Sequence, residues 1–180
     1  MAFGRARKSA RPPLDEAGLL EYAVKSLGSR MKSERDLRRN MAQRAEPDEA
    51  GRTAIDAVIT KLKELGYLSD ERFAADYTRL RQENEKFGRR RVQQGLMQKG
   101  VASVTVNEAV GKAYDEVDEV ALARAYAERK RMRKPEDEKE TARAMRRLVA
   151  AGFSTRAVWA VLRSWGAAVE EVDVVDGGDE

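Results

Sequence analysis

The stretch "LMQKGVASVTVNEAV", residues 96–110, is matched without gaps by "LVAAGFSTRAVWAVL", residues 148–162. Both stretches begin with leucine, carry glycine four residues later, and place apolar residues at the same positions beyond the glycine. Glycine readily adopts the left-handed conformation in which helices commonly end, so each stretch predicts a helix, a tight turn and a second helix. A joint that recurs 52 residues later indicates a fold built from tandem helical repeats.

The rest of the chain has the apolar spacing of amphipathic helices. Apolar residues recur every three or four positions, and stretches that alternate as a strand does are few and weak. The first expected helix has a stripe formed by Leu20, Ala23, Val24 and Leu27. The clearest stripe consists of Ile55, Val58, Ile59, Leu62 and Leu65. We therefore expect about nine helices and no sheet.

Cap residues mark where several of these helices begin. Ser33, Ser69 and Ser154 each precede a helical stretch, and a serine side chain there can accept a hydrogen bond from a backbone amide of the first turn. Pro47 and Pro135 stand where a first helical residue is expected, since proline is tolerated at that position. The helices thus group in threes, each group with a long helix, a short helix and a third helix.

These groups predict an all-α fold of three tandem three-helix repeats, stacked into an elongated, curved array. The repeats span residues 14–68, 69–115 and 116–166. A basic leader, residues 1–13, and an acidic tail, residues 167–180, are predicted to be disordered because neither can bury enough apolar surface. A compact helical bundle whose internal similarity is accidental stays open as an alternative.

The composition excludes several classes of site. The 180 residues include no cysteine and no histidine, which rules out disulfides, Cys/His zinc sites, thiol nucleophiles and histidine-based triads. No phosphate-binding loop or dinucleotide fingerprint is present, and no run of about 18 apolar residues suggests a membrane span. We expect a cytoplasmic, monomeric protein without enzymatic activity, cofactor or metal.

A second joint, "GYLSDERFAADYTRLR", spans residues 66–81. Gly66 can end one helix in the left-handed conformation, and Ser69 can cap the next. Tyr67 and Leu68 are expected to fold back as an apolar plug, with Phe73 facing the core. We interpret these residues as mainly structural.

This joint also carries a family resemblance. Together with "RMKSERDLRRNM" (residues 30–41) and "FGRRRVQQGLMQKGV" (residues 87–101), it resembles the RecX family, regulatory proteins that modulate the RecA recombinase. The similarity extends from about Leu19 to Trp165, and its most specific part is the Gly-Tyr-Leu-x-Asp-x-Arg-Phe-Ala string. The signature positions in this chain are Gly66, Tyr67, Leu68, Asp70, Arg72 and Phe73.

The resemblance implies three three-helix repeats and a non-enzymatic function. Members bind the RecA recombinase and its filament on single-stranded DNA, and they inhibit its ATPase, strand-exchange and coprotease activities. The chain departs from the family pattern in its basic leader, its acidic tail and the Phe87 that precedes Gly88.

Basic residues cluster at comparable places in the three repeats. Stacked repeats would join these clusters into a stripe that fits phosphate or carboxylate groups, which the planar guanidinium binds with two parallel hydrogen bonds. The candidate partner-binding residues are Arg35, Arg38, Arg39, Lys86, Arg89, Arg90, Arg91, Arg131 and Arg133. A solvated surface with helical ion pairs, such as Glu34–Arg38, is the alternative for individual arginines.

A helix-turn-helix transcriptional regulator is the rival function. A short helix, a glycine turn and a second helix imitate the DNA-binding motif, but a recognition helix needs side chains that read base edges. The helices after the glycine turns offer little beyond Asn107, Lys112, Arg156 and Arg163. The rival reading stays open.

Overall fold

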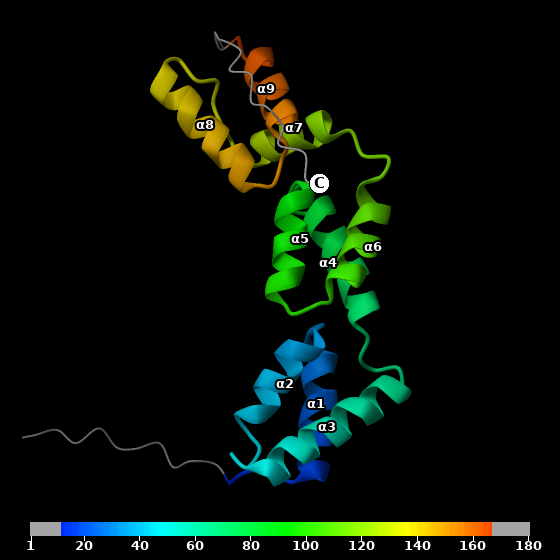
Figure 1. Ribbon diagram of the computed structural model, residues 1–180. Coiled ribbons are helices and arrows are strands. Elements are labelled where there is room, and N and C mark those ends of the chain that lie inside the picture. Colours follow the sequence, from blue (N-terminus) through cyan, green and yellow to red (C-terminus); the bar gives the residue numbers. More distant parts are fainter. Residues whose placement is uncertain (1–11, 167–180) are drawn as a thin grey trace, which may run out of the picture. The chain divides into compact units, whose positions relative to one another are not determined.

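The computed structural model describes residues 12–166, and in this range the chain forms nine α-helices and no strand (Figure 1). The helices are α1 (Glu16–Ser29), α2 (Glu34–Ala42), α3 (Glu49–Glu64), α4 (Asp70–Glu83), α5 (Arg89–Gln98), α6 (Ser103–Tyr114), α7 (Glu119–Arg129), α8 (Glu138–Ala150) and α9 (Thr155–Ser164). The all-α prediction is confirmed. The predictions of disorder for the leader and the tail fall mainly on residues outside the described range.

The chain divides into two compact units. Of the described residues, the first unit contains 12–77 and 95–109, and the second unit contains 78–94 and 110–166. Helices α4, α5 and α6 contribute residues to both units. The three predicted repeats and their curved stacking therefore stay predictions.

The core of the first unit joins α1, α2 and α3. Leu19 and Ala23 of α1 are fully buried, whereas Val24 is 43% exposed. The buried face of α1 is therefore rotated relative to the expected stripe. It is centred on Leu19 and Ala23, which lie about one turn apart on the same side of the helix. Their buried partners on the other two helices are Leu37, Met41, Ile55, Val58, Ile59 and Leu62.

An aromatic chain organises the second unit. The ring of Phe87, just before α5, lies 6.1 Å from that of Tyr126 on α7, which lies 5.7 Å edge-on from Phe153 in the turn between α8 and α9. Trp159 and Trp165 pack against the same core. Its other buried members are Ala123, Ala144, Leu148, Ala151, Ala157, Val158, Val161 and Leu162.

The helix starts follow the cap predictions with one correction. Ser33 and Ser154 are N-caps, but Asp48 and Asp137 cap α3 and α8 in place of the expected proline starts. Each aspartate accepts a hydrogen bond from an amide three residues on, a role that proline cannot fill. Four helix ends carry a glycine in the left-handed conformation, at Gly66, Gly100, Gly152 and Gly166.

The two turns that match in sequence make the same kind of contact. The Lys99 carbonyl, just before one glycine, accepts a hydrogen bond from Ser33 Oγ at the start of α2 (2.7 Å). The Ala151 carbonyl, 52 residues on, accepts one from the amide of Gly88 at the start of α5 (2.9 Å). Each turn thus receives the beginning of an earlier helix.

The second of these contacts requires glycine at position 88. A Cβ atom there would collide with the carbonyl group of Gly152. Gly88→Ala should therefore lower the free energy of unfolding by about 1–3 kcal/mol, as measured by urea denaturation followed by circular dichroism.

Gly111→Ala is the matched control, because its Cβ would meet no atom within 4 Å and alanine favours the interior of α6. This variant should be as stable as the parent or more stable by up to about 1 kcal/mol. A Gly88→Ala protein of parental stability would show that the close backbone approach is dispensable.

Candidate partner-binding surface

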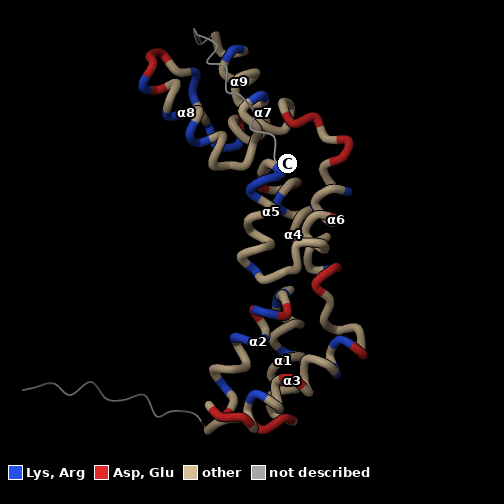
Figure 2. Tube along the Cα trace, viewed as in Figure 1, with Lys and Arg blue, Asp and Glu red and all other residues tan. Residues whose placement is uncertain are grey.

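Positive charge is concentrated in the second unit. Its described residues include 19 Lys and Arg against 11 Asp and Glu, whereas those of the first unit include 12 against 14. Basic segments follow one another at the start of α5, along the connection between α7 and α8, and on α8 (Figure 2). The formal net charge of +4 for the whole chain conceals this separation.

The predicted basic cluster of the first unit is largely neutralised by neighbouring carboxylates. Arg38 pairs with Glu34 (2.7 Å) and Asp56 (2.5 Å), and Arg39 pairs with Asp36 (2.9 Å). Arg38 and Arg39 also line a shallow hollow of about 320 Å³ beside Arg52. The Glu34–Arg38 pair is the helical ion pair expected from the spacing.

Arg35 is exposed and lies over the glycine turn between α5 and α6. A Cβ atom at Gly100 would collide with the aliphatic part of its side chain. The three predicted contacts on α2 therefore differ in their surroundings: only Arg35 has no ion pair with another described residue.

Asp70 of the family signature has a structural role at the start of α2. Its carboxylate accepts a hydrogen bond from the Glu34 amide (2.9 Å), and burial raises its pKa. Burial would raise the pKa of Glu34 as well, but hydrogen bonds from Lys63 and Arg38 outweigh it and hold that pKa below its usual range. The start of α2 is thus tied to both α3 and α4.

Four predicted basic residues of the second unit, Lys86 and residues 89–91, flank Phe87 in the sequence, and the other two, Arg131 and Arg133, follow α7, the helix that carries Tyr126. Phe87 joins the turn before α5 to Tyr126 of α7, and Lys130 at the end of α7 lies 3.7 Å from Glu85 in the same turn. The amide of Arg90 donates to the Gly152 carbonyl, which holds the first turn of α5 against the turn between α8 and α9. We call this region the joint surface and define it as Lys86, Arg89, Arg90, Arg91, Arg131 and Arg133.

The residues of the joint surface are not neutralised as those on α2 are. None of the six forms an ion pair with another residue in the range 12–166. Five of them are exposed, Lys86 is half-buried, and the guanidinium of Arg91 lies 5.9 Å from the centre of the Phe87 ring. Arg131 and Arg133 lie in the connection after α7 and not on a helix. Their charge is therefore available to an anionic partner.

Two of these cations have an unusual backbone conformation. Lys86 and Arg131 adopt left-handed conformations, with φ of 56° and 48°, in the turns that follow α4 and α7. The next amides donate back into the preceding helices, from Phe87 to the Arg81 carbonyl and from Met132 to the Ala127 carbonyl. Glycine occupies the left-handed positions at four other helix ends, and a side chain there costs about 1–2 kcal/mol. Sequence spacing could not detect this conformation, since the only signal is a lysine or arginine where a glycine is usual.

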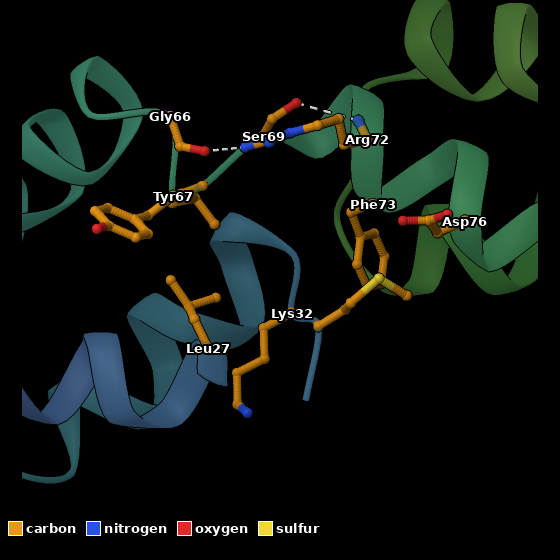
Figure 3. A pocket seen from close by; sticks show the side chains of 10 residues that line it. Leu27, Lys32, Gly66, Tyr67, Ser69, Arg72, Phe73 and Asp76 are labelled. Atoms are coloured by element: carbon orange, nitrogen blue, oxygen red, sulfur yellow. Dashed lines mark hydrogen bonds between the residues drawn. The ribbon is translucent and has the colours of Figure 1, made fainter. Parts of the chain in front are cut away.

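All the signature residues except Asp70 line a groove of about 300 Å³ in the first unit (Figure 3). Leu68 and Phe73 are buried as expected, but Tyr67 is 61% exposed, so its predicted core role is wrong. The amides of Tyr67 and Leu68 both donate to the Leu62 carbonyl, and in this tight turn only Leu68 points inward.

The remaining signature residue fixes the shape of this turn. The Arg72 guanidinium donates a hydrogen bond to the Gly66 carbonyl, and the Arg72 amide donates to Ser69 Oγ (3.1 Å) (Figure 3). Met31, 41% exposed, lies on the same groove and was missed by the sequence reasoning. The signature therefore builds a helix joint with an open groove beside it.

Comparisons with known proteins agree with this fold. Residues 69–110 match the family model described as RecX, second three-helix domain. A Regulatory protein RecX from Leptothrix cholodnii is 34% identical over 156 residues, which cover 86% of this chain and 92% of that protein. The chain belongs to the RecX family.

Further RecX proteins support the assignment. A Regulatory protein RecX from Escherichia coli is 38% identical over 120 residues, or 63% of this chain and 70% of the relative. The crystal structure of RecX from Lactobacillus salivarius has a TM-score of 0.64 at 18% identity and covers 84% of this chain and 97% of that one. A second RecX crystal structure has a TM-score of 0.65 at 21% identity, covering 83% of this chain and 73% of that one. These two structures show the same fold.

Within residues 12–166, no helix combines the length and apolar character needed to span a bilayer. The same residues hold no group of three or more carboxylates suited to a metal ion.

The left-handed cations lead to a prediction about stability. Lys86→Gly and Arg131→Gly should each raise the free energy of unfolding by up to about 1 kcal/mol. Glycine removes the cost of the left-handed conformation in the folded state, and the greater entropy of the unfolded glycine chain offsets part of this gain. Urea denaturation measures the change. Lys86→Ala and Arg131→Ala remove the same charge but keep the cost, so they should give no such gain; equal gains for alanine and glycine would contradict this account.

The carboxylates at the start of α2 lead to a prediction about pH. The folded-state pKa of Asp70 is raised, so its ionised form costs stability at neutral pH, and this cost disappears as the pH falls through that pKa toward the ordinary value of 3.8. Asp70→Asn keeps an acceptor for the Glu34 amide and should be at least as stable as the parent at neutral pH. That advantage should vanish near pH 3.8.

Two further variants check the direction in which the pH changes the stability. Asp70→Ala leaves the Glu34 amide without its acceptor and should lose about 1–3 kcal/mol. Glu34→Gln should lose stability at neutral pH, and the loss should shrink as the pH falls below 4.5, because the ionised Glu34 is the stabilising form. Urea denaturation at several pH values measures all three; a constant difference for Glu34→Gln across this range would refute the pH effect.

Proposed function

We propose that this RecX protein binds the RecA recombinase and its filament on single-stranded DNA, and that it inhibits the ATPase, strand-exchange and coprotease activities of RecA. Membership in a family of regulatory proteins supports a regulatory and non-enzymatic role. The observation that carries the proposal is the joint surface, whose six cations have no carboxylate partner in the described part of the chain.

The joint surface has the chemistry of a contact with a polymeric anion. Arg89, Arg90 and Arg91 stand in succession on the first turn of α5, and a guanidinium can donate two parallel hydrogen bonds to a phosphate or a carboxylate. The partner group is either a DNA phosphate of the filament or an acidic surface of RecA. Direct contacts with single- or double-stranded DNA are expected to be weaker than those with the filament. We further propose that the protein acts in the cytoplasm, as a monomer and without a cofactor.

The rival helix-turn-helix function is disfavoured by the start of α9. A recognition helix directs its first residues to base edges, and its positive end lies close to DNA. Here the Glu119 carboxylate accepts hydrogen bonds from the amide (2.7 Å) and the hydroxyl (2.6 Å) of Ser154, the N-cap of α9. A carboxylate at that position repels phosphate, so α9 is poorly suited to enter a DNA groove.

Charge reversal on the joint surface tests the proposal. Arg89→Glu with Arg90→Glu should weaken inhibition of single-stranded-DNA-dependent ATP hydrolysis by RecA at least tenfold in the concentration required, because two attractive contacts become repulsive. Glutamate is favourable in the first turn of a helix, so this variant should remain folded, which circular dichroism checks.

Lys25→Glu with Lys61→Glu is the matched control. It changes the net charge by the same amount on exposed residues of the first unit, neither of which forms an ion pair with another described residue. This control should inhibit nearly as well as the parent. Equal losses in the two variants would reduce the effect to net charge, and unchanged ATP hydrolysis with excess parent protein would reject RecA inhibition itself.

A further inference from the structure

The segment that follows the second unit has the opposite charge to that unit. Residues 167–180 contain six acids and no base, namely Glu170, Glu171, Asp173, Asp176, Asp179 and Glu180. The described residues of the second unit have 19 basic and 11 acidic side chains, a net charge of +8. We propose that residues 167–180 dock on the joint surface of the same chain and compete there with the anionic partner. The identity of that partner rests on the proposed function, but the intramolecular contact does not.

Gly166, which precedes this segment, belongs to the second unit and lies close to its basic residues. A Cβ atom at Gly166 would lie 3.3 Å from Nζ of Lys134, so the last described residue lies beside the basic connection between α7 and α8. Arg131 and Arg133 of the joint surface belong to that connection. Glu170 and Glu171 follow Gly166 by four and five residues, a distance that an extended chain spans in about 13–18 Å.

Tethering makes the contact effective although each ion pair is weak. Attachment to the same chain raises the local concentration of the acidic groups into the millimolar range, so several weak contacts suffice for docking. The attraction is screened over about 8–10 Å at moderate salt, which makes the docked state sensitive to ionic strength. The first unit offers a poorer target, since its described residues have a slight excess of acids and its Arg38 and Arg39 are already paired.

An anionic partner that binds the joint surface must then displace the segment. Displacement weakens adventitious binding to isolated polyanions more than binding to a partner that makes additional contacts elsewhere. The segment thus acts as an internal competitor that sharpens selectivity. The opposing view is a segment that only improves solubility and touches nothing.

The contact is tested without any partner by comparing amide NMR spectra of the full chain and a variant with all six acids replaced by Gln or Asn. Shifts are expected at residues 89–91 and 130–134, and about 0.5 M salt should move the parent spectrum toward that of the variant. Shifts confined to the vicinity of the substitutions would overturn the docking. This outcome is independent of any effect on RecA, so the failure of this inference and that of the proposed function are distinguishable.

The competition is tested with a labelled oligothymidylate as the polyanion probe. E170Q/E171Q/D173N should bind it about threefold to tenfold more tightly than the parent at about 50 mM salt, with the difference shrinking as salt rises. The matched control E21Q/E46Q/E64Q neutralises three exposed acids of the first unit and should change affinity less than about twofold. Equal affinity for parent and tail variant, equal gains in both variants, or no binding by any of them would overturn the competition.

Discussion

The fold depends on carbonyl groups that a helix cannot satisfy by itself. The last carbonyls of a helix have no amide partner within it. The Lys99 carbonyl accepts a hydrogen bond from the Ser33 hydroxyl and the Ala151 carbonyl accepts one from the Gly88 amide, each donor lying at the start of an earlier helix. In both cases a left-handed glycine follows at once, which turns the chain away and leaves room for the approaching helix. The two carbonyls lie at equivalent positions of the two matching stretches, so the same helix-end geometry occurs twice in the chain. Where donor and acceptor are both backbone groups, the Gly88 amide and the Ala151 carbonyl, a Cβ atom on Gly88 or on Gly152 would collide with the facing backbone.

Much of this architecture follows from local signals in the sequence. The helix ends at Gly66, Gly100, Gly152 and Gly166 could be predicted because only glycine takes the left-handed conformation without strain. The N-caps Ser33 and Ser154 could likewise be predicted from the sequence. The starts of α3 and α8 were misplaced, because an aspartate after a proline competes for the cap and binds the first-turn amide more effectively.

The candidate site was less accessible to sequence reasoning, because it depends on residues far apart in the chain. The basic clusters were visible, but Asp56, which binds Arg38 from another helix, lies 18 residues away and has no local signature. The approach of Lys130 to Glu85 likewise depends on packing between α7 and the turn before α5. The basic clusters on α2 and around α5 look alike in the sequence. In the structure, carboxylates neutralise much of the first cluster, whereas the joint surface has no such partners among the described residues. The exposed ring of Tyr67 illustrates the same limit, since the direction of a side chain in a turn depends on which carbonyl holds the backbone.

Both tryptophans of the chain, Trp159 and Trp165, are partly buried and pack against the core of the second unit. Indole emission is therefore blind to events confined to α1, α2 and α3, whereas the far-ultraviolet ellipticity sums over every helix. Any lag between these two optical signals during melting would reveal that the halves of the molecule lose their order separately. The chain thus contains its own spectroscopic label for one half, with no dye attached.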